Sequence, residues 1–345
     1  MQRIHLLPGA SARRLEPGGL AAGAARSRVR PPSAAFALVA EDMAKAEAVL
    51  TDIVGDTIEP VDGAVRYLAS AGGKRVRPLL TALGARALGV GGDLSRLMTV
   101  GELIHLGSLL HDDVVDDAST RRGIDAAQHV YGNALVILSG DFCLAQGVLL
   151  ASEHGGQACV SGLAEALKAM AEGEVLQLRR AGDLDTTRED YLEIVDRKSA
   201  ALIAWCASVG ARVLDDTALT ARMDRFGRAI GVAFQVTDDI LDYGGRSELT
   251  GKTPGTDLKD RKLTLPLLFA LERDPELAER LGRPVQAEQI REIIERVRAT
   301  GALERAGAFA KELVEGGIAE LDVLPESPHK AALAELARYL AERVA

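Results

Sequence analysis

Aromatic residues and cysteines are scarce in this chain of 345 residues. Aromatic side chains make up 3% of it, and its three cysteines, Cys143, Cys159 and Cys206, lie in apolar segments and form no C-x-x-C pair. This pattern excludes a disulfide framework and a cysteine-based metal site, and it is typical of a protein in a reducing compartment. We therefore expect three buried thiols with a structural role.

A surplus of positive charge and long apolar runs are also lacking. The net charge is −9 at pH 7, whereas a general nucleic-acid binder needs a surplus of Lys and Arg to hold the phosphate backbone. No apolar run approaches the roughly 18–20 residues of a membrane span, because the segment 134–138 is soon followed by Gly140 and Asp141. We therefore expect a cytoplasmic protein that binds no nucleic acid.

Residues 1–35 differ in composition from the rest of the chain. They hold six arginines, one acidic residue (Glu16) and several Gly, Pro and Ser. An Arg-rich, acid-poor leader has the composition of an organellar transit peptide, although a disordered tail is the simpler interpretation. We exclude this segment from the fold, leave organellar targeting open, and assign residues 36–345 to one domain.

The rest of the chain has the periodicity of helices. Apolar residues recur at helical spacing and the alternation of strands is scarce, so the sequence predicts an all-α fold. Ser327 is expected to cap a final helix that begins at Pro328. No internal repeat or linker divides the body. Helices are expected over 33–58, 61–70, 79–88, 94–117, 134–153, 157–180, 187–213 and 218–243, with loops over 118–125 and 244–263 and three amphipathic segments after them.

Two acidic signatures with the spacing D-D-x-x-D lie inside these apolar segments. The first holds Asp112, Asp113 and Asp116, and the second, 126 residues later, holds Asp238, Asp239 and Asp242. On a helix, residues at i and i+4 share a face, so the carboxylates of each cluster are expected to converge. One such motif alone is usually a solvated helix end. Two of them indicate Mg²⁺ ions that hold a phosphate-bearing substrate.

Basic residues supply a counterpart to these six acids. The Gly72-Gly73 pair gives a flexible turn before Lys74 and Arg77. Arginine binds phosphate with two parallel hydrogen bonds, and lysine adds a point charge. The set suits two diphosphates, one held through metal ions and one held by cations directly. It consists of Lys74, Arg77, Arg121, Arg122, Lys198, Lys252 and Lys262.

In these motifs the chain resembles the trans-isoprenyl diphosphate synthases, also called polyprenyl synthetases, across roughly residues 40–345. The resemblance rests on nine motifs in family order: Gly72-Gly73-Lys74-Arg75-x-Arg77-Pro78, Glu102-x-x-His105, His111-Asp112-Asp113-x-x-Asp116, Arg121-Arg122-Gly123, Gly140-Asp141-Phe142, Gly173-Glu174-x-x-Gln177, Lys198-Ser199-Ala200, Phe234-Gln235-x-x-Asp238-Asp239-x-x-Asp242 and Gly251-Lys252-x-x-Gly255-x-Asp257-Leu258. Any one motif would be weak, but together they are specific.

The resemblance implies a single-domain helical bundle around a deep central cavity, usually as a homodimer, that joins isopentenyl diphosphate to an allylic diphosphate. It implies that Asp112, Asp113, Asp116, Asp238 and Asp239 hold Mg²⁺, with Asp242 in support. It further implies that Arg121, Lys198, Ser199, Gln235, Lys252 and Lys262 lie at the allylic diphosphate, and that Lys74, Arg77, His105 and Arg122 bind isopentenyl diphosphate. Asp112, Asp113, Asp116, Lys198, Asp238 and Asp239 would be the catalytic set.

Product length in this family depends on the residues just before the first acidic cluster. Gly107 and Ser108 stand there, and neither side chain would close a tunnel. We therefore predict a long-chain product, C30 or longer, of the kind used for quinone side chains, and peripheral membrane contact for its release. A short-chain synthase is the alternative. A terpene cyclase fits poorly with so few aromatics, and a non-catalytic partner subunit fits poorly with two intact acidic clusters.

Overall fold

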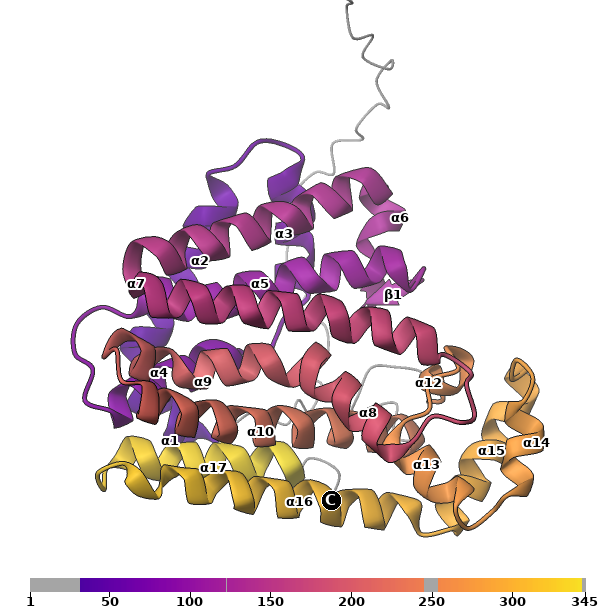
Figure 1. Ribbon diagram of the computed structural model, residues 1–345. Coiled ribbons are helices and arrows are strands. Elements are labelled where there is room, and N and C mark those ends of the chain that lie inside the picture. The colour runs from indigo at the N-terminus through magenta and orange to yellow at the C-terminus, as the bar shows by residue number, and fades with distance from the viewer. Residues whose placement is uncertain (1–31, 122, 245–253, 343–345) are drawn as a thin grey trace, which may run out of the picture.

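Helices make up almost all of the regular structure in the computed structural model, which describes residues 32–121, 123–244 and 254–342 (Figure 1). A two-stranded antiparallel hairpin, β1 (Thr120–Arg121) and β2 (Ile124–Asp125), is the exception in this part of the chain. The helices are α1 Ser33–Leu38, α2 Ala40–Gly55, α3 Val61–Ser70, α4 Val76–Ala87, α5 Ser95–Val115, α6 Ala127–Tyr131, α7 Asn133–Arg180, α8 Arg188–Val195, the π-helix η1 Asp196–Ala200, α9 Ala201–Val213, α10 Thr217–Gly244, α12 Thr256–Lys259, α13 Leu265–Leu271, α14 Glu276–Leu281, α15 Ala287–Ala299, α16 Ala302–Ala319, the 3₁₀ helix η2 Glu320–Val323 and α17 Pro328–Glu342.

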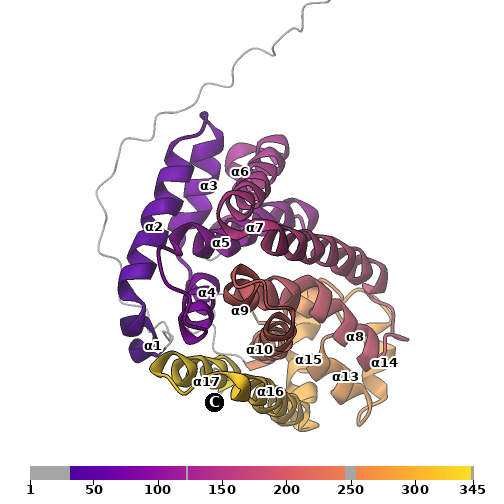
Figure 2. The same cartoon turned by 60° about the vertical axis from the view of Figure 1, so that its left-hand side comes forward.

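The central helix of the bundle is α9. Every residue from Ala201 to Ala211 is buried, which is expected of a helix that is apolar on all sides and lies inside a domain. Figure 2 shows α9 and α10 near the middle, with α4, α5, α7 and α17 around them. Small residues permit this close packing: a Cβ at Gly210 would lie 2.5 Å from the Cα of Ala85 on α4.

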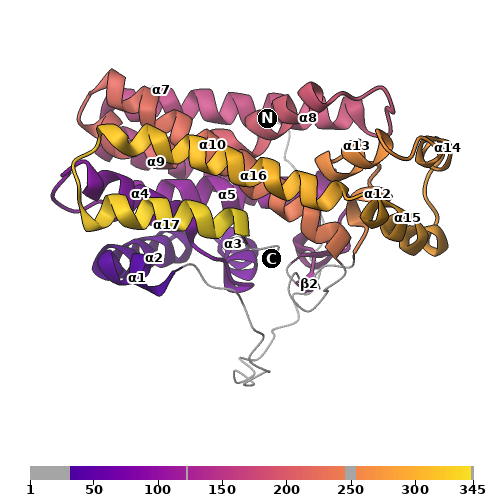
Figure 3. The same cartoon turned by 90° about the horizontal axis from the view of Figure 1, so that it is seen from below.

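Two hydrophobic clusters share α9. One includes Leu103, Leu163 and Trp205 and joins α3, α5 and α7 to one side of α9. The other includes Leu80 and Phe226 and joins α4 and α10 to the C-terminal helices. Figure 3 shows α16 and α17 lying across the face of the bundle seen from below, where they contact α10 and α4 respectively.

Most helices predicted from the sequence are confirmed. The break between 153 and 157 is a kink at Gly156, which has φ 70°, a value that glycine adopts readily. The Oγ of Ser327 accepts a hydrogen bond from the N–H of Lys330 at 3.1 Å, as predicted for the cap of α17. The segment 187–213 is continuous but contains the π-helix η1.

Two predicted elements are wrong in detail. The segment 33–58 is not one helix, because the chain turns at Val39 (φ −127°, ψ 26°), which brings Ala35 and Val39 into the core. The loop 118–125 contains the hairpin β1–β2. Its first residues follow Asp117, whose φ of 46° ends the helical course of α5.

The helix α7 also corrects the prediction about apolar runs. One 18-residue window of it has a mean hydropathy of 1.9 and is 39% buried, so by length and composition it meets the criterion for a membrane span. The single charge of Asp141 does not offset the apolar residues around it. Core helices of soluble proteins meet the same criterion, so this finding is only weak evidence for a membrane span.

Candidate active site

The first acidic cluster lies at the C-terminal end of α5. Asp112 belongs to the last turn, and Asp116 is the residue that ends the helix. Burial raises the pKa of the Asp112 carboxyl to about 6, although Lys198 and Arg121 act in the opposite direction. The negative charge of Asp112 is therefore only partly compensated by the protein, and an additional cation beside it would be favourable.

The carboxylate of Asp113 is paired within the protein. Its side chain is fully buried, and its Oδ1 accepts a hydrogen bond from the Nε of Arg121 at 2.6 Å. Its Oδ2 accepts the N–H of Ala127 at 3.4 Å. Asp113 and Arg121 thus neutralise one another and fasten the β1–β2 hairpin to α5. Their predicted contacts with metal and with diphosphate stay predictions.

The second cluster lies near the C-terminal end of α10. Asp239 is 4% exposed, and both of its oxygens accept hydrogen bonds, from the Tyr191 hydroxyl at 2.6 Å and from the Gln235 Nε2 at 2.8 Å. The Oε1 of Gln235 in turn accepts the hydroxyl of Ser199 at 2.9 Å. Burial raises the pKa of Asp239 to about 6, while the hydrogen bonds from Tyr191 and Gln235 act against this shift.

Asp242, the last acid of the second cluster, holds the start of α12. Its Oδ1 accepts the N–H of Thr256 at 3.2 Å and its Oδ2 accepts the N–H of Asp257 at 3.0 Å. A carboxylate at the N-terminus of a helix satisfies N–H groups that have no partner within the helix. Asp242 therefore positions the segment that leads to Lys262.

The π-helix η1 lies between the two clusters. Lys198 on η1 acts electrostatically on Asp112 and forms an ion pair with Glu174 of α7, and the next residue, Ser199, reaches Gln235 beside Asp239. A Cβ at Gly173 would lie 2.5 Å from the backbone N of Lys198, so only glycine lets α7 approach this closely. Single π-turns of this kind recur at functional sites.

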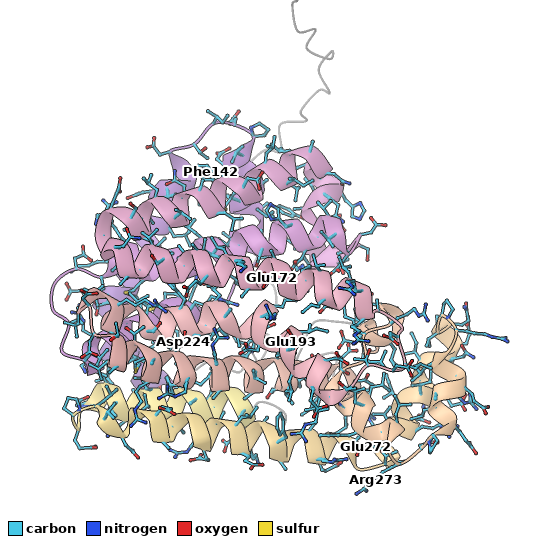
Figure 4. All side chains as sticks on the ribbon, in the orientation of Figure 1. Phe142, Glu172, Glu193, Asp224, Glu272 and Arg273 are labelled. Carbon is cyan, nitrogen blue, oxygen red and sulfur yellow. The ribbon has the colours of Figure 1, made fainter. Side chains whose placement is uncertain are left out.

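Ion pairs hold η1 from its outer side. Arg197 bonds Glu172 of α7 at 2.5 Å and Glu193 of α8 at 3.0 Å, and Figure 4 shows these two glutamates on the face where the helices meet. Arg228 of α10 bonds Asp196 at 2.7 Å. These pairs are about 40% exposed, so each contributes little stability alone. Together they link η1 to α7, α8 and α10.

Lys262 completes the link between the clusters. Its Nζ lies 3.9 Å from Asp116 Oδ2 and 3.0 Å from Asp260 Oδ2. Burial alone would lower the pKa of Lys262, but Asp116, Asp260 and Asp257 together raise it. Since Asp257 also bonds Asp242, the amine connects the end of α5 with the end of α10. The structure thus brings both clusters, Lys198 and Lys262 into one region.

The carboxylates of each cluster do not converge on one point. Within residues 32–121, 123–244 and 254–342, no three His, Cys, Asp or Glu side chains form a group that would hold a metal ion. The prediction of convergence is wrong because Asp113 turns to Arg121 and Asp242 turns to α12. The donors nevertheless fit a hard divalent cation, since they are carboxylate oxygens, and burial leaves Asp112 and Asp239 with raised pKa values.

The predicted second anion site includes Arg77. The Nε atom of Arg77 is buried and, among the described residues, has no hydrogen-bond partner. Burial lowers its pKa, while Glu102, Cys206 and Asp238 act to raise it. Lys74 is exposed and His105 is partly buried two turns before Asp112. Arg122 and Lys252 lie outside the described residues.

The two residues predicted to control product length differ in their surroundings. A Cβ at Gly107 would lie 2.9 Å from the backbone O of Gly140 on α7. Gly107 therefore belongs to a helix–helix contact, and its role in product length stays a prediction. Ser108 is partly buried one turn before Asp112, and its hydroxyl bonds the carbonyl of His105 at 2.9 Å. The role of Ser108 in product length also stays a prediction.

Tyr191 and Arg75 belong to the site but were not assigned a role from the sequence. Tyr191 lies seven residues before Lys198, which is two helical turns, so its position on the same face was the available signal.

We expect Tyr191→Phe to weaken binding of a divalent cation about tenfold, since the carboxylate of Asp239 loses a hydrogen bond that fixes its orientation. Titration of Mn²⁺ followed by electron paramagnetic resonance measures this, and unchanged affinity would show that Tyr191 has only a packing role.

Sequence comparison identifies close relatives of this chain. A family model described as Polyprenyl synthetase matches residues 59–299. The chain is 36% identical over 313 residues to the octaprenyl diphosphate synthase of Escherichia coli, which covers 89% of this chain and 97% of that protein. It is 34% identical over 320 residues to solanesyl diphosphate synthase 1, chloroplastic, of Arabidopsis thaliana, covering 90% and 78% respectively.

Solved structures agree with these relatives. A polyprenyl synthase from Caulobacter crescentus CB15, complexed with calcium and isoprenyl diphosphate, is similar with a TM-score of 0.86 and 37% identity, over 90% of this chain and 98% of that one. A decaprenyl diphosphate synthase from Rhodobacter capsulatus is similar with a TM-score of 0.83 and 34% identity, over the same shares. The likeness therefore extends over both acidic clusters and η1.

Proposed function

The chain belongs to the polyprenyl synthetase family, and we propose that this prenyltransferase condenses isopentenyl diphosphate with an allylic diphosphate to give a long-chain all-trans polyprenyl diphosphate. Relatives named for octaprenyl, solanesyl and decaprenyl products support a length of C30 or more. Products of this length are precursors of quinone side chains. The all-helical fold agrees with the prediction, and the deep central cavity stays part of the proposal.

The arrangement around η1 carries the proposed chemistry. Lys198 acts on Asp112 of the first cluster, and Ser199 reaches through Gln235 to Asp239 of the second. The two acidic helix ends are only partly buried, and they lie in one region with the cations Lys198 and Lys262. Such a site suits a ligand that carries negative charge together with divalent cations that bind the carboxylates. A diphosphate together with divalent cations meets this requirement.

Mg²⁺ is the metal ion that we propose. Asp112, Asp116, Asp238 and Asp239 would hold it, with Asp113 recruited only if its pair with Arg121 opens. When bound, the ion neutralises charge on the diphosphate and thereby favours its departure. Relatives in this family depend on divalent metals, and one solved relative was obtained with calcium.

The protein's own residues prepare both substrates for reaction. Lys198, Lys262 and Gln235, with Arg121 and Lys252, would hold the allylic diphosphate and offset the charge that develops as its C–O bond ionises. Lys74, Arg77, His105 and Arg122 would orient isopentenyl diphosphate so that its double bond attacks the allylic cation. The cation formed by this attack loses a proton as the new double bond forms. The departing diphosphate would accept that proton, so no separate base is needed. Exclusion of water from the site would protect the allylic cation from hydrolysis.

Removal of divalent cations tests the metal proposal. Purified protein treated with a chelator and then supplied with Mg²⁺ should regain incorporation of labelled isopentenyl diphosphate, whereas an equal concentration of K⁺ should not restore it. Activity that persists through chelation would contradict the assignment of the carboxylates. Calcium is a useful second ion, because restoration by calcium but not by magnesium would correct the identity of the metal alone.

Ser108 is the position at which we expect product length to change. Ser108→Phe should shift the products toward shorter chains, because an aromatic ring one turn before Asp112 would limit the space for the growing chain. Chromatography of the dephosphorylated products measures the shift. Gly107→Phe is the matched control: it should lower stability through its clash with Gly140. An unchanged product distribution in a folded Ser108→Phe variant would contradict this placement.

We also propose a homodimer that forms through the first half of α7. This segment exposes Ile137 (41%), Leu138 (60%), Val148 (38%) and Leu149 (48%). Their helical spacing makes one largely apolar stripe, which also holds the exposed side chain of Asp141. A membrane-surface helix carries Lys or Arg on its polar face, but residues 133–153 contain neither. A second copy of the chain therefore fits this stripe better than a lipid surface does.

The oligomeric state tests this interface. We expect the double variant Leu138→Glu, Leu149→Glu to sediment as a monomer in analytical ultracentrifugation where the parent chain sediments as a dimer, because burial of the four apolar side chains is lost. Val175→Glu, on the second half of α7 and also exposed (56%), is the matched control and should leave the dimer intact. A dimeric double variant would contradict the interface. Binding of the parent chain to vesicles would instead place the stripe at a membrane surface, where the apolar product could be released.

A further inference from the structure

Arg75 has an unusual backbone for a residue with a side chain. It precedes α4 with φ 48° and ψ 36°, in the left-handed region that non-glycine residues rarely adopt. It stands between Lys74 and Val76, directly before Arg77 of the predicted second anion site. A strained conformation of this kind persists only where the surroundings hold it, and such positions gather at functional sites.

Two glutamates hold the Arg75 side chain. Its Nε and Nη2 donate to both oxygens of Glu47 on α2 at 3.0 and 2.9 Å, and its Nη1 donates to Glu102 on α5 at 2.5 Å. Glu102 is only 4% exposed, and a buried carboxylate requires such a partner. The planar guanidinium can meet both acids at once, which lysine cannot do. This Glu47–Arg75–Glu102 clamp joins three helices at the start of α4.

The clamp lies beside the groups predicted to bind isopentenyl diphosphate. Glu102 precedes His105 by one helical turn on α5, and Arg77 follows Arg75 by two residues. Gly101, next to Glu102, permits the close approach, since a Cβ there would lie 3.4 Å from the Cβ of Arg77. The Nε of Arg77 is buried without a hydrogen-bond partner among the described residues, so no hydrogen bond from this atom fixes the orientation of the side chain.

We infer that Arg75 is a positioning residue: gripped by Glu47 and Glu102, it imposes the left-handed turn that directs Lys74 and Arg77 toward the diphosphate of isopentenyl diphosphate. This inference rests on the proposed function. The clamp does not touch the substrate. It selects one conformation of the turn after the Gly72-Gly73 pair, where a flexible backbone would otherwise spread the two cations over many positions.

Arg75→Asn separates the clamp from the backbone conformation, because asparagine tolerates the left-handed region but cannot reach both glutamates. We expect its KM for isopentenyl diphosphate to rise roughly tenfold, with kcat and the KM for the allylic substrate within about twofold of the parent values. Calorimetric titration of isopentenyl diphosphate alone should show the same loss of affinity. Glu47→Gln, which leaves the bond to Glu102, should give a smaller rise.

Arg86→Asn is the matched control. Arg86 lies in the last turn of α4 and likewise bonds an acid of α2, with its Nε and Nη2 on Asp42 at 3.0 and 2.6 Å. Its loss should lower the melting temperature and leave both KM values unchanged. If Arg75→Asn raises both KM values equally, or neither, the clamp is only a structural link and the inference fails. If Arg75→Asn does not fold, an unchanged KM for isopentenyl diphosphate in Glu47→Gln overturns it.

Lys74→Ala, measured alongside, distinguishes this inference from the proposed function. A Lys74→Ala variant with unchanged affinity for isopentenyl diphosphate would remove the substrate assignment itself. Weakened affinity in Lys74→Ala together with unchanged affinity in Arg75→Asn would leave that assignment in place and reject the clamp alone.

Discussion

Asp112→Asn is expected to lower turnover by about 10³-fold or more while leaving the helical content unchanged. The carboxylate of Asp112 is held near Lys198 and Glu174, with its pKa raised by burial to about 6. It is therefore the group of the first cluster whose charge most needs an external cation, and the amide can neither supply that charge nor bind the metal ion well. Incorporation of labelled isopentenyl diphosphate gives kcat, and circular dichroism reports the fold.

Asp117→Asn is the control for this change. Asp117 is exposed, it lies five residues further along the chain, and its φ of 46° is one that asparagine also tolerates. Its turnover should stay within about twofold of the parent enzyme. Asp238→Ala, in the second cluster, should repeat the loss seen at Asp112. Full activity in either cluster variant would contradict the metal assignment.

Arg121→Met is expected to destabilise the protein by about 2–3 kcal/mol. The substitution strands the fully buried carboxylate of Asp113, whose 2.6 Å hydrogen bond from Arg121 is lost. The figure lies below the cost of breaking a fully buried pair, because the Arg121 side chain is 20% exposed. Denaturant unfolding followed by circular dichroism measures the free energy of unfolding.

Two further variants show whether the burial of Asp113 is the cause. Arg66 pairs with Asp62, and the Arg66 side chain is 61% exposed. Arg66→Met should therefore change the free energy of unfolding by less than about 0.5 kcal/mol. Asp113→Asn combined with Arg121→Met should recover part of the lost stability, because no charge is then stranded. A loss in Arg121→Met no larger than that in Arg66→Met would show that the pair is not stabilising.

The sequence was sufficient to predict the helical body and the chemical set of the site. Apolar periodicity predicted α3 to the residue and α10 to within one residue at each end, and Gly156 marked the kink in α7. Acidic spacing and its match to a known family predicted the clusters and cations that the structure brings together around η1. These features depend on local patterns, which a single sequence contains.

The remaining features depend on contacts between distant segments. Asp113 has the same spacing as its neighbours, and its orientation follows from Arg121 and the N–H of Ala127. Tyr191 reaches Asp239 across 48 positions, and Arg75 joins Glu47 and Glu102 from α2 and α5. Spacing before Asp112 could not show that Gly107 meets the backbone of α7. Such choices are made by tertiary packing and are not visible in periodicity.

The product of the reaction is the most direct test of the proposed function. The chain of 345 residues would be incubated with Mg²⁺, farnesyl diphosphate and labelled isopentenyl diphosphate, with Asp112→Asn as the inactive control. The dephosphorylated products would then be separated by length. We predict a ladder that ends at C30 or beyond. Products that stop at C20 would contradict the long-chain assignment, and the absence of any incorporation would contradict catalysis by this chain alone.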